Sequence, residues 1–302
     1  MSKKRKIAYL AAVGNALIWG AALPLVKPSL SHITPYQFLF LRFLVAAPLL
    51  FPFLIKGILK QKRLVKALPK IVLIEVLSMT VLFIIYLGLE KTSALQASFF
   101  LNTKPIFTTL AGILILKEVE ERNELIGLIF SVIGTALVIS TPLFFGKQLA
   151  DSEFSLFGNG LIFSALLLDV IRLIYVNKIY DKQDKLNVVS ISTLIGLIYF
   201  ALVSSLTGDF PSLSVLQIPS VLIPVLYMGT LGTIVAFTLQ YVAYTQIETS
   251  EASLFSYLQP LVYIPLSVIW LKETLLPTQL IGIIIIAFGV FIAERRIKKK
   301  RA

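Results

Sequence analysis

The sequence predicts an all-α integral membrane protein with ten transmembrane helices, arranged as two inverted five-helix repeats. Three observations support this fold class. The 302-residue chain is 57% hydrophobic and only 15% charged, whereas soluble proteins average about 25% charged residues. Its Lys and Arg residues gather on one side of the apolar blocks, and a long stretch of the first half recurs in the second half.

The apolar residues form continuous blocks of about 20 residues, the length at which a helix crosses roughly 30 Å of hydrocarbon. Ten blocks are predicted, at residues 7–26, 36–55, 69–89, 94–116, 123–141, 157–177, 188–207, 220–245, 250–271 and 276–293. Their continuity argues against barrel strands, which alternate apolar and polar residues. The first block follows a basic start, as in a signal peptide, but its length favours a retained transmembrane helix.

The positive charges predict the orientation of the chain. Of the 28 Lys and Arg residues, 21 fall in the segments on the N-terminal side, four in the opposite loops and three inside helices. Positive residues stay on the cytoplasmic side of a membrane, so both termini are expected inside the cell. The same rule explains the net charge of +12 without a nucleic-acid partner.

The repeat pairs residues 98–118 with residues 253–273, which share Ser-x-Phe, a Pro and a terminal Leu-Lys-Glu at matching positions. It predicts two units, residues 1–142 and 156–302, joined by an external linker at 143–155. Because five helices are an odd number, the second unit would enter the membrane from the opposite side. Inverted repeats of this kind are typical of secondary transporters, whose site lies near the membrane midplane between the repeats.

The repeated helices carry the strongest candidate site. Lys104 lies mid-helix, where a cation is costly and usually faces a cavity or a partner, and Pro105 is expected to break the helix. The helical wheel groups Lys104, Thr108 and Gly112 on one face, and the matching face of the second copy holds Ser256, Gln259, Tyr263 and Ser267. This face is predicted to line the cavity, with Lys104 suited to an anionic group such as a carboxylate. Further cavity candidates on other helices are Asn15, Trp19, Tyr86, Gln240, Tyr241 and Tyr244.

Other intramembrane charges have structural alternatives. Lys104 could instead form a buried salt bridge with Glu75 or Asp169, and Asp169 and Arg172 have the spacing of an internal ion pair. Glu75 and Asp169 are also the candidates for proton coupling, whereas Arg42 is expected to be structural. The repeated Lys-Glu pair is interpreted as a structural turn, with a gate contact as the alternative. No metal site is expected, since there is no Cys and one His, His32, in an external loop.

Several short motifs lie along this framework: Trp19-Gly20, Arg42-Phe43, the Pro of each repeated helix, and Leu-Lys-Glu at 116–118 and 271–273. In this combination the chain resembles the EamA-type branch of the drug/metabolite transporter superfamily over residues 7–293. The resemblance implies a ten-helix fold whose central cavity is lined by the first, third, fourth, sixth, eighth and ninth helices. It also implies export of amino acids or other small metabolites in many members. Asp169 and Arg172 depart from the more apolar sixth helix of many relatives.

The predicted function is therefore secondary-active transport, with export as the expected direction, of small metabolites such as amino acids by alternating access around a midplane cavity. The chain has no phosphate-binding loop for ATP, and no catalytic residues or cofactor are assigned. Its expected partners are a small-molecule substrate and the lipid bilayer of a prokaryotic cell membrane, and its oligomeric state is left open. The alternatives are an intramembrane enzyme acting on a lipid and a passive channel.

Overall fold

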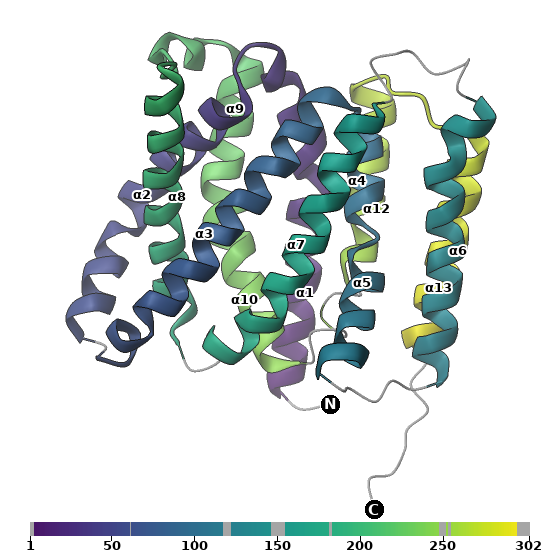
Figure 1. Ribbon diagram of the computed structural model, residues 1–302, viewed down its shortest axis with the longest axis horizontal. Helices are drawn as coiled ribbons and strands as arrows, with labels where there is room; N and C mark the ends of the chain where they lie inside the picture. The colour runs from purple at the N-terminus through teal and green to yellow at the C-terminus, as the bar shows by residue number, and fades with distance from the viewer. Residues whose placement is uncertain are drawn as a thin grey trace, which may run out of the picture.

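The computed structural model describes residues 3–60, 62–116, 122–145, 155–180, 183–247, 252 and 255–294, which form a helical bundle (Figure 1). Its longer helices are α1 (Lys3–Val26), α2 (Pro35–Lys60), α3 (Lys62–Lys91), α6 (Arg122–Phe145), α7 (Leu156–Tyr180), α8 (Lys185–Thr207), α10 (Ala236–Gln246) and α13 (Pro277–Glu294). Its shorter segments are η1 (Lys27–Ser31), α4 (Ala94–Leu101), α5 (Lys104–Ala111), η2 (Gly112–Leu116), η4 (Leu213–Gln217), α9 (Pro219–Tyr227), η5 (Met228–Val235), η6 (Phe255–Leu258), α12 (Pro260–Pro265) and η7 (Leu266–Trp270).

Each of the ten predicted apolar blocks is helical over most of its described residues. Six helical stretches in that part of the chain are long and apolar enough to cross a membrane: Lys4–Ser31, Pro35–Gly57, Leu64–Lys91, Leu156–Val176, Lys185–Thr207 and Pro219–Gln246. Large apolar side chains such as Leu59, Leu73 and Leu206 are exposed on the outside of the bundle. An apolar exterior of this kind fits a helical protein whose surroundings are lipid rather than water.

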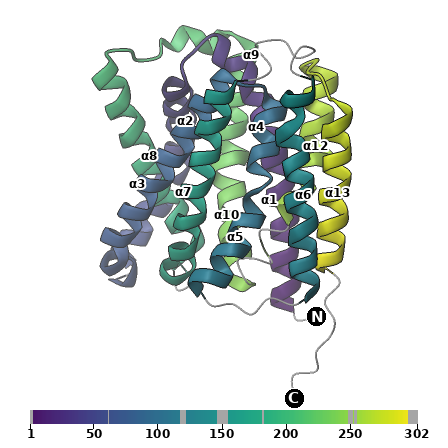
Figure 2. The same ribbon diagram turned by 45° about the vertical axis from the view of Figure 1, so that its right-hand side comes forward.

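The helices pack mainly as pairs that join the first half of the chain to the second. α1 packs against α10, α2 against α8, α3 against α7, and α6 against α13. The pair α6 and α13 stands at one edge of the bundle in both views (Figures 1 and 2). There the helices approach so closely that a Cβ atom at Gly134 would lie 2.5 Å from the carbonyl oxygen of Gly282.

The predicted helix break at Pro105 is present. α4 ends at Leu101 and α5 begins at Lys104, with Asn102 and Thr103 in the turn between them. In the second copy, the 3-10 segment η6 gives way to α12 at Pro260. The two interrupted helices touch where the Asn102 side-chain amide donates a hydrogen bond to the Tyr263 hydroxyl at 2.9 Å. Proline causes such breaks because it has no amide hydrogen and its ring clashes with the preceding turn.

The Lys-Glu pair of the second copy serves the corner between α3 and α4. The Glu273 carboxylate accepts hydrogen bonds from the backbone amides of Ala94 and Leu95, at 2.8 and 2.7 Å, at the start of α4. Lys272, with a φ of 59°, forms the tight turn before it. Glu273 thus joins the second unit to the start of α4 in the first, a contact that fits both the structural interpretation and a gate contact, whereas Lys117 and Glu118 lie outside the described residues.

Candidate functional site

A cavity of about 160 Å³ lies inside the bundle, between α1, α3, the α4–α5 break, α7, α10 and the η6–α12 break. These are the six regions that the family resemblance implies. The lining residues are Ala12, Asn15, Trp19, Leu23, Ser78, Val81, Leu82, Ile85, Tyr86, Ser98, Leu101, Lys104, Asp169, Arg172, Phe237, Gln240, Tyr244, Ala252, Phe255, Ser256, Gln259 and Tyr263. The lining therefore combines apolar and aromatic side chains with nine polar or charged ones, so it can hold a small organic ligand that has both an apolar part and polar groups.

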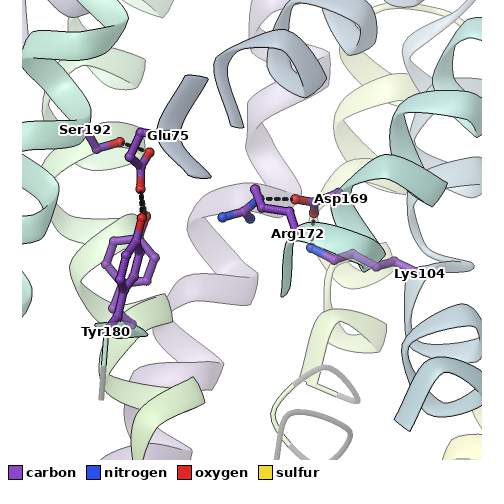
Figure 3. Close-up of polar contacts among 7 residues, drawn as sticks. Glu75, Lys104, Asp169, Arg172, Tyr180 and Ser192 are labelled. Carbon is purple, nitrogen blue, oxygen red and sulfur yellow. Dashed lines mark hydrogen bonds and ion pairs between the residues drawn. The ribbon is translucent and has the colours of Figure 1, made fainter. Parts of the chain in front are cut away.

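Three charged side chains form one ionic network on the cavity wall (Figure 3). The Lys104 ammonium group, at the first residue of α5, donates to Oδ2 of Asp169. Nε of Arg172, one turn further along α7, donates to Oδ1 of the same carboxylate at 2.7 Å. The ion pair expected between Asp169 and Arg172 is confirmed, and Lys104 forms the salt bridge with Asp169 that the sequence left as the alternative to a ligand-binding role. All three residues also line the cavity. Lys104 is therefore both the ion-pair partner of Asp169 and a part of the cavity wall.

Most of the predicted site residues share this cavity. Asn15, Trp19, Tyr86, Lys104, Ser256, Gln259 and Tyr263 line it, as do Gln240 and Tyr244. Thr108 and Tyr241 do not belong to the lining, and neither do Gly112 and Ser267 of the face predicted to line it. The Thr108 hydroxyl donates to the Lys104 carbonyl oxygen at 2.9 Å, and the Tyr241 hydroxyl donates to Glu75 at 3.2 Å. The positions predicted for these two side chains are thus not those that the structure shows.

Glu75 lies behind the cavity wall, at the centre of a hydroxyl cluster (Figure 3). Its buried carboxylate accepts hydrogen bonds from the hydroxyls of Tyr180 at 2.5 Å and Ser192 at 2.6 Å, as well as from Tyr241. The four side chains come from α3, α7, α8 and α10, so this cluster ties together helices of both halves. Glu75 does not line the cavity.

Arg42 supports the cavity from the side of α2. Its fully buried guanidinium donates to the Thr233 hydroxyl at 2.8 Å and to the Tyr86 hydroxyl at 3.4 Å. It also lies over the rings of Trp19 and Phe237, each centred 5.6 Å away. Since Tyr86, Trp19 and Phe237 line the cavity, Arg42 helps fix the wall, which agrees with the structural role predicted for it.

Sequence reasoning missed Arg172 as a member of the cavity wall. Its spacing from Asp169 signalled an ion pair, and nothing in the sequence indicated that the guanidinium would also face the cavity. The hydroxyl partners of Glu75 were missed because they come from distant helices. His32 is exposed at the end of η1, and among the described residues no group of three or more His, Asp or Glu side chains could hold a metal ion.

The fold and the cavity define a multi-pass membrane protein with a charged cavity enclosed by helices. The chain belongs to the EamA-like transporter family, which matches residues 6–140 and again residues 156–294. It is therefore a transporter and not an enzyme.

Relatives agree along nearly the full length of the chain. The uncharacterized transporter YetK of Bacillus subtilis (strain 168) is 26% identical over 99% of this chain and 89% of the relative. A probable amino-acid metabolite efflux pump of Salmonella typhimurium is 27% identical over 95% of this chain and 94% of the pump. The alignment with a protein of known crystal structure covers 96% of this chain and 96% of that protein, with a TM-score of 0.72. At 16% identity this likeness shows the fold alone.

Proposed function

We propose that this protein is a secondary transporter that moves small organic metabolites, such as amino acids, by alternating access around the cavity. The observation that carries this proposal is the ionic network of Lys104, Asp169 and Arg172 on the wall of a cavity of about 160 Å³. Charges inside a membrane bundle are costly and commonly mark a substrate or ion pathway. A cavity of this size suits a metabolite better than a drug-sized ligand.

The helix pairing supports an inverted duplication, with units at 1–142 and 156–302 and a linker at 143–155. The family matches each unit once. If the first five apolar blocks correspond in order to the last five, α1 corresponds to α7 and α3 corresponds to α10. Exchanging the units then turns the pair α1–α10 into the pair α7–α3. The same exchange returns the pairs α2–α8 and α6–α13 to themselves. This pattern is that expected from a two-fold relation between the units, and two such units can open alternately to the two sides.

The charge distribution supports a position in a prokaryotic cell membrane with ten crossings and both termini inside. The beginning of α1 and the end of α13 lie at the same end of the bundle, as an even number of crossings requires (Figure 1). Export of an amino-acid metabolite is the direction suggested by the Salmonella relative. Glu75 and Asp169 are the residues we propose for proton coupling.

Flux measurements on the purified protein in proteoliposomes test this function. A carrier gives saturable uptake of a labelled amino acid and counter-exchange, in which unlabelled solute inside accelerates entry of the label. Proteoliposomes without internal solute and liposomes without the protein provide the controls. A flux that rises linearly with concentration and shows no counter-exchange would support a channel and contradict the carrier.

A further inference from the structure

We propose that Arg172, rather than Lys104, binds a carboxylate group of the transported solute. This inference rests on the proposed function and adds the chemical class of the ligand and the residue that recognises it. The preferred ligand is a small molecule with one carboxylate and an apolar or aromatic remainder. Four features of the cavity lead to it.

The first feature is the set of donors that Arg172 leaves unused. A guanidinium carries five N–H groups, and only the one on Nε is engaged, by Asp169. Within the described part of the chain, Nη1 and Nη2 have no hydrogen-bond or ion-pair partner. The side chain is about 95% buried but lines the cavity, and its terminal nitrogens point away from Asp169 (Figure 3). This pair of nitrogens has the geometry that binds a carboxylate through two parallel hydrogen bonds.

The second feature is the kind of donor that Lys104 offers, because Lys104 and Arg172 both contact Asp169 and, among the described residues, both keep N–H groups unused. The Lys104 ammonium is in direct contact with Oδ2 of Asp169. An ammonium is a compact charge without a fixed fork, so it gives less geometric selection between a carboxylate and another anion. Lys104 and Asp169 therefore serve to hold Arg172 in place and to reduce the cost of its burial.

The third feature is the balance of buried charge. Around the cavity, the charged side chains that the structure describes at mid-bundle are Arg42, Lys104 and Arg172 against Glu75 and Asp169, an excess of one positive charge. Among the residues that the structure describes, Glu75 is held by three hydroxyl donors and by no direct contact with a cation. An excess cation inside a membrane protein is unfavourable, and a monovalent anion bound at Arg172 would neutralise it.

The fourth feature is the apolar remainder of the lining. Leu82, Trp19 and Phe237 contribute to the same cavity as Arg172. They offer burial to an aliphatic or aromatic group attached to the carboxylate, at about 25 cal/mol per Å² of apolar surface removed from water. An inorganic anion or a highly hydroxylated solute would leave this surface unused.

Ligand-dependent thermal unfolding of the purified protein tests the inference. The probes are L-leucine, L-phenylalanine and 4-methylpentanoate, each compared with its carboxamide, which keeps the size and removes the charge. In the wild-type protein we expect at least one carboxylate probe to raise Tm with saturation, and its carboxamide to have no effect at the same concentration. This comparison needs no variant, so it remains decisive even if a variant does not fold.

The variants Arg172→Gln and Arg172→Lys locate the binding group. Both are expected to weaken binding of the carboxylate probe roughly 10- to 100-fold, because each loses the bidentate hydrogen bonds. Lys91→Gln, which removes an exposed positive charge outside the cavity, is the control and should bind the probe as the wild type does.

Three results would overturn the inference: no carboxylate probe binds the wild type, acid and amide bind equally, or the folded Arg172 variants keep the wild-type affinity. Each leaves the proposed function standing if proteoliposomes still show saturable flux and counter-exchange of a cationic or neutral solute. Absence of any carrier flux, with the carboxylate probe still bound at Arg172, would instead contradict the proposed function alone.

Discussion

Two carboxylates inside the bundle, the partly buried Asp169 and the fully buried Glu75, are satisfied in opposite ways. Asp169 lies on the cavity wall and pairs with two cations, and both of them keep N–H donors beyond this contact. Glu75 lies behind the wall and takes hydroxyl donors from three other helices. The first arrangement leaves hydrogen-bonding capacity for a ligand, whereas the second uses that capacity to join helices. The difference separates a site that can bind from a site that holds the scaffold.

Removing the charge of Asp169 is expected to have the largest effect. Asp169→Asn leaves Lys104 and Arg172 facing each other without an anion and should lower the free energy of unfolding by about 3 kcal/mol. Titration with SDS in mixed micelles measures this change. The double variant Asp169→Asn/Lys104→Gln removes one charge of each sign and should recover part of the loss. If the two losses simply add, the network is not coupled and the comparison fails.

Removing the charge of Glu75 tests the other side of the comparison. Glu75→Gln weakens the hydrogen bonds from three hydroxyls and should lower the free energy of unfolding by about 2 kcal/mol. Tyr180→Phe removes one donor of the same cluster and should cost about 1 kcal/mol, measured in the same titration. Loss of ligand affinity equal to that of Arg172→Gln, without loss of stability, would show that Glu75 belongs to the binding site.

A third carboxylate, Glu273, sharpens the comparison because backbone amides satisfy it. Ser93 is the N-cap residue of α4, and Glu273 accepts from the first two amides beside it, so Glu273→Ala should lower the free energy of unfolding by about 1 kcal/mol. Glu273→Gln, which keeps one acceptor oxygen, is the matched variant and should lose less. Equal stability of the wild type and the Ala variant would contradict the capping role.

The pH dependence of Glu273 gives the smallest expected effect. Burial raises the pKa of Glu273 above its ordinary value of 4.5, although the two amides and Lys27 oppose the rise. The folded protein therefore holds this proton more tightly than the unfolded chain. The stability that the proton contributes is complete below pH 4.5 and is lost as the pH rises through the raised pKa.

Thermal unfolding of the wild type and Glu273→Gln over the same pH series isolates this contribution. The wild type should lose stability relative to the variant as the pH rises from about 4.5 towards neutrality. A change in the opposite direction would mean that the backbone amides outweigh burial and lower the pKa.

Much of the fold follows from local features of the sequence. The apolar runs predicted the helices, Pro105 predicted the break before α5, and the spacing of Asp169 and Arg172 predicted their ion pair. These features depend on residues close together in the chain, where helix length, proline sterics and side-chain spacing act directly.

The details of the site depend on how the helices face one another, which a helical wheel or local residue spacing does not reveal. The helical wheel placed Thr108 with Lys104, but its hydroxyl bonds the backbone of its own helix. Tyr241 follows Gln240 by one residue, and the step of about 100° turns it from the cavity towards Glu75. The π-helical segments η2, η5 and η7 also change the number of residues per turn, so a regular wheel drifts across them.

The most direct test of the account asks whether a transported solute occupies the cavity. The chain has no Cys, so Ser78→Cys places a single thiol on the cavity wall, and Ser205→Cys places one on an exposed part of α8 as the control. The rate of maleimide labelling is measured in proteoliposomes with and without the solute. We expect a saturating solute to slow labelling at residue 78 and leave residue 205 unchanged. Labelling at residue 78 that ignores a solute whose saturable flux is established would contradict the account.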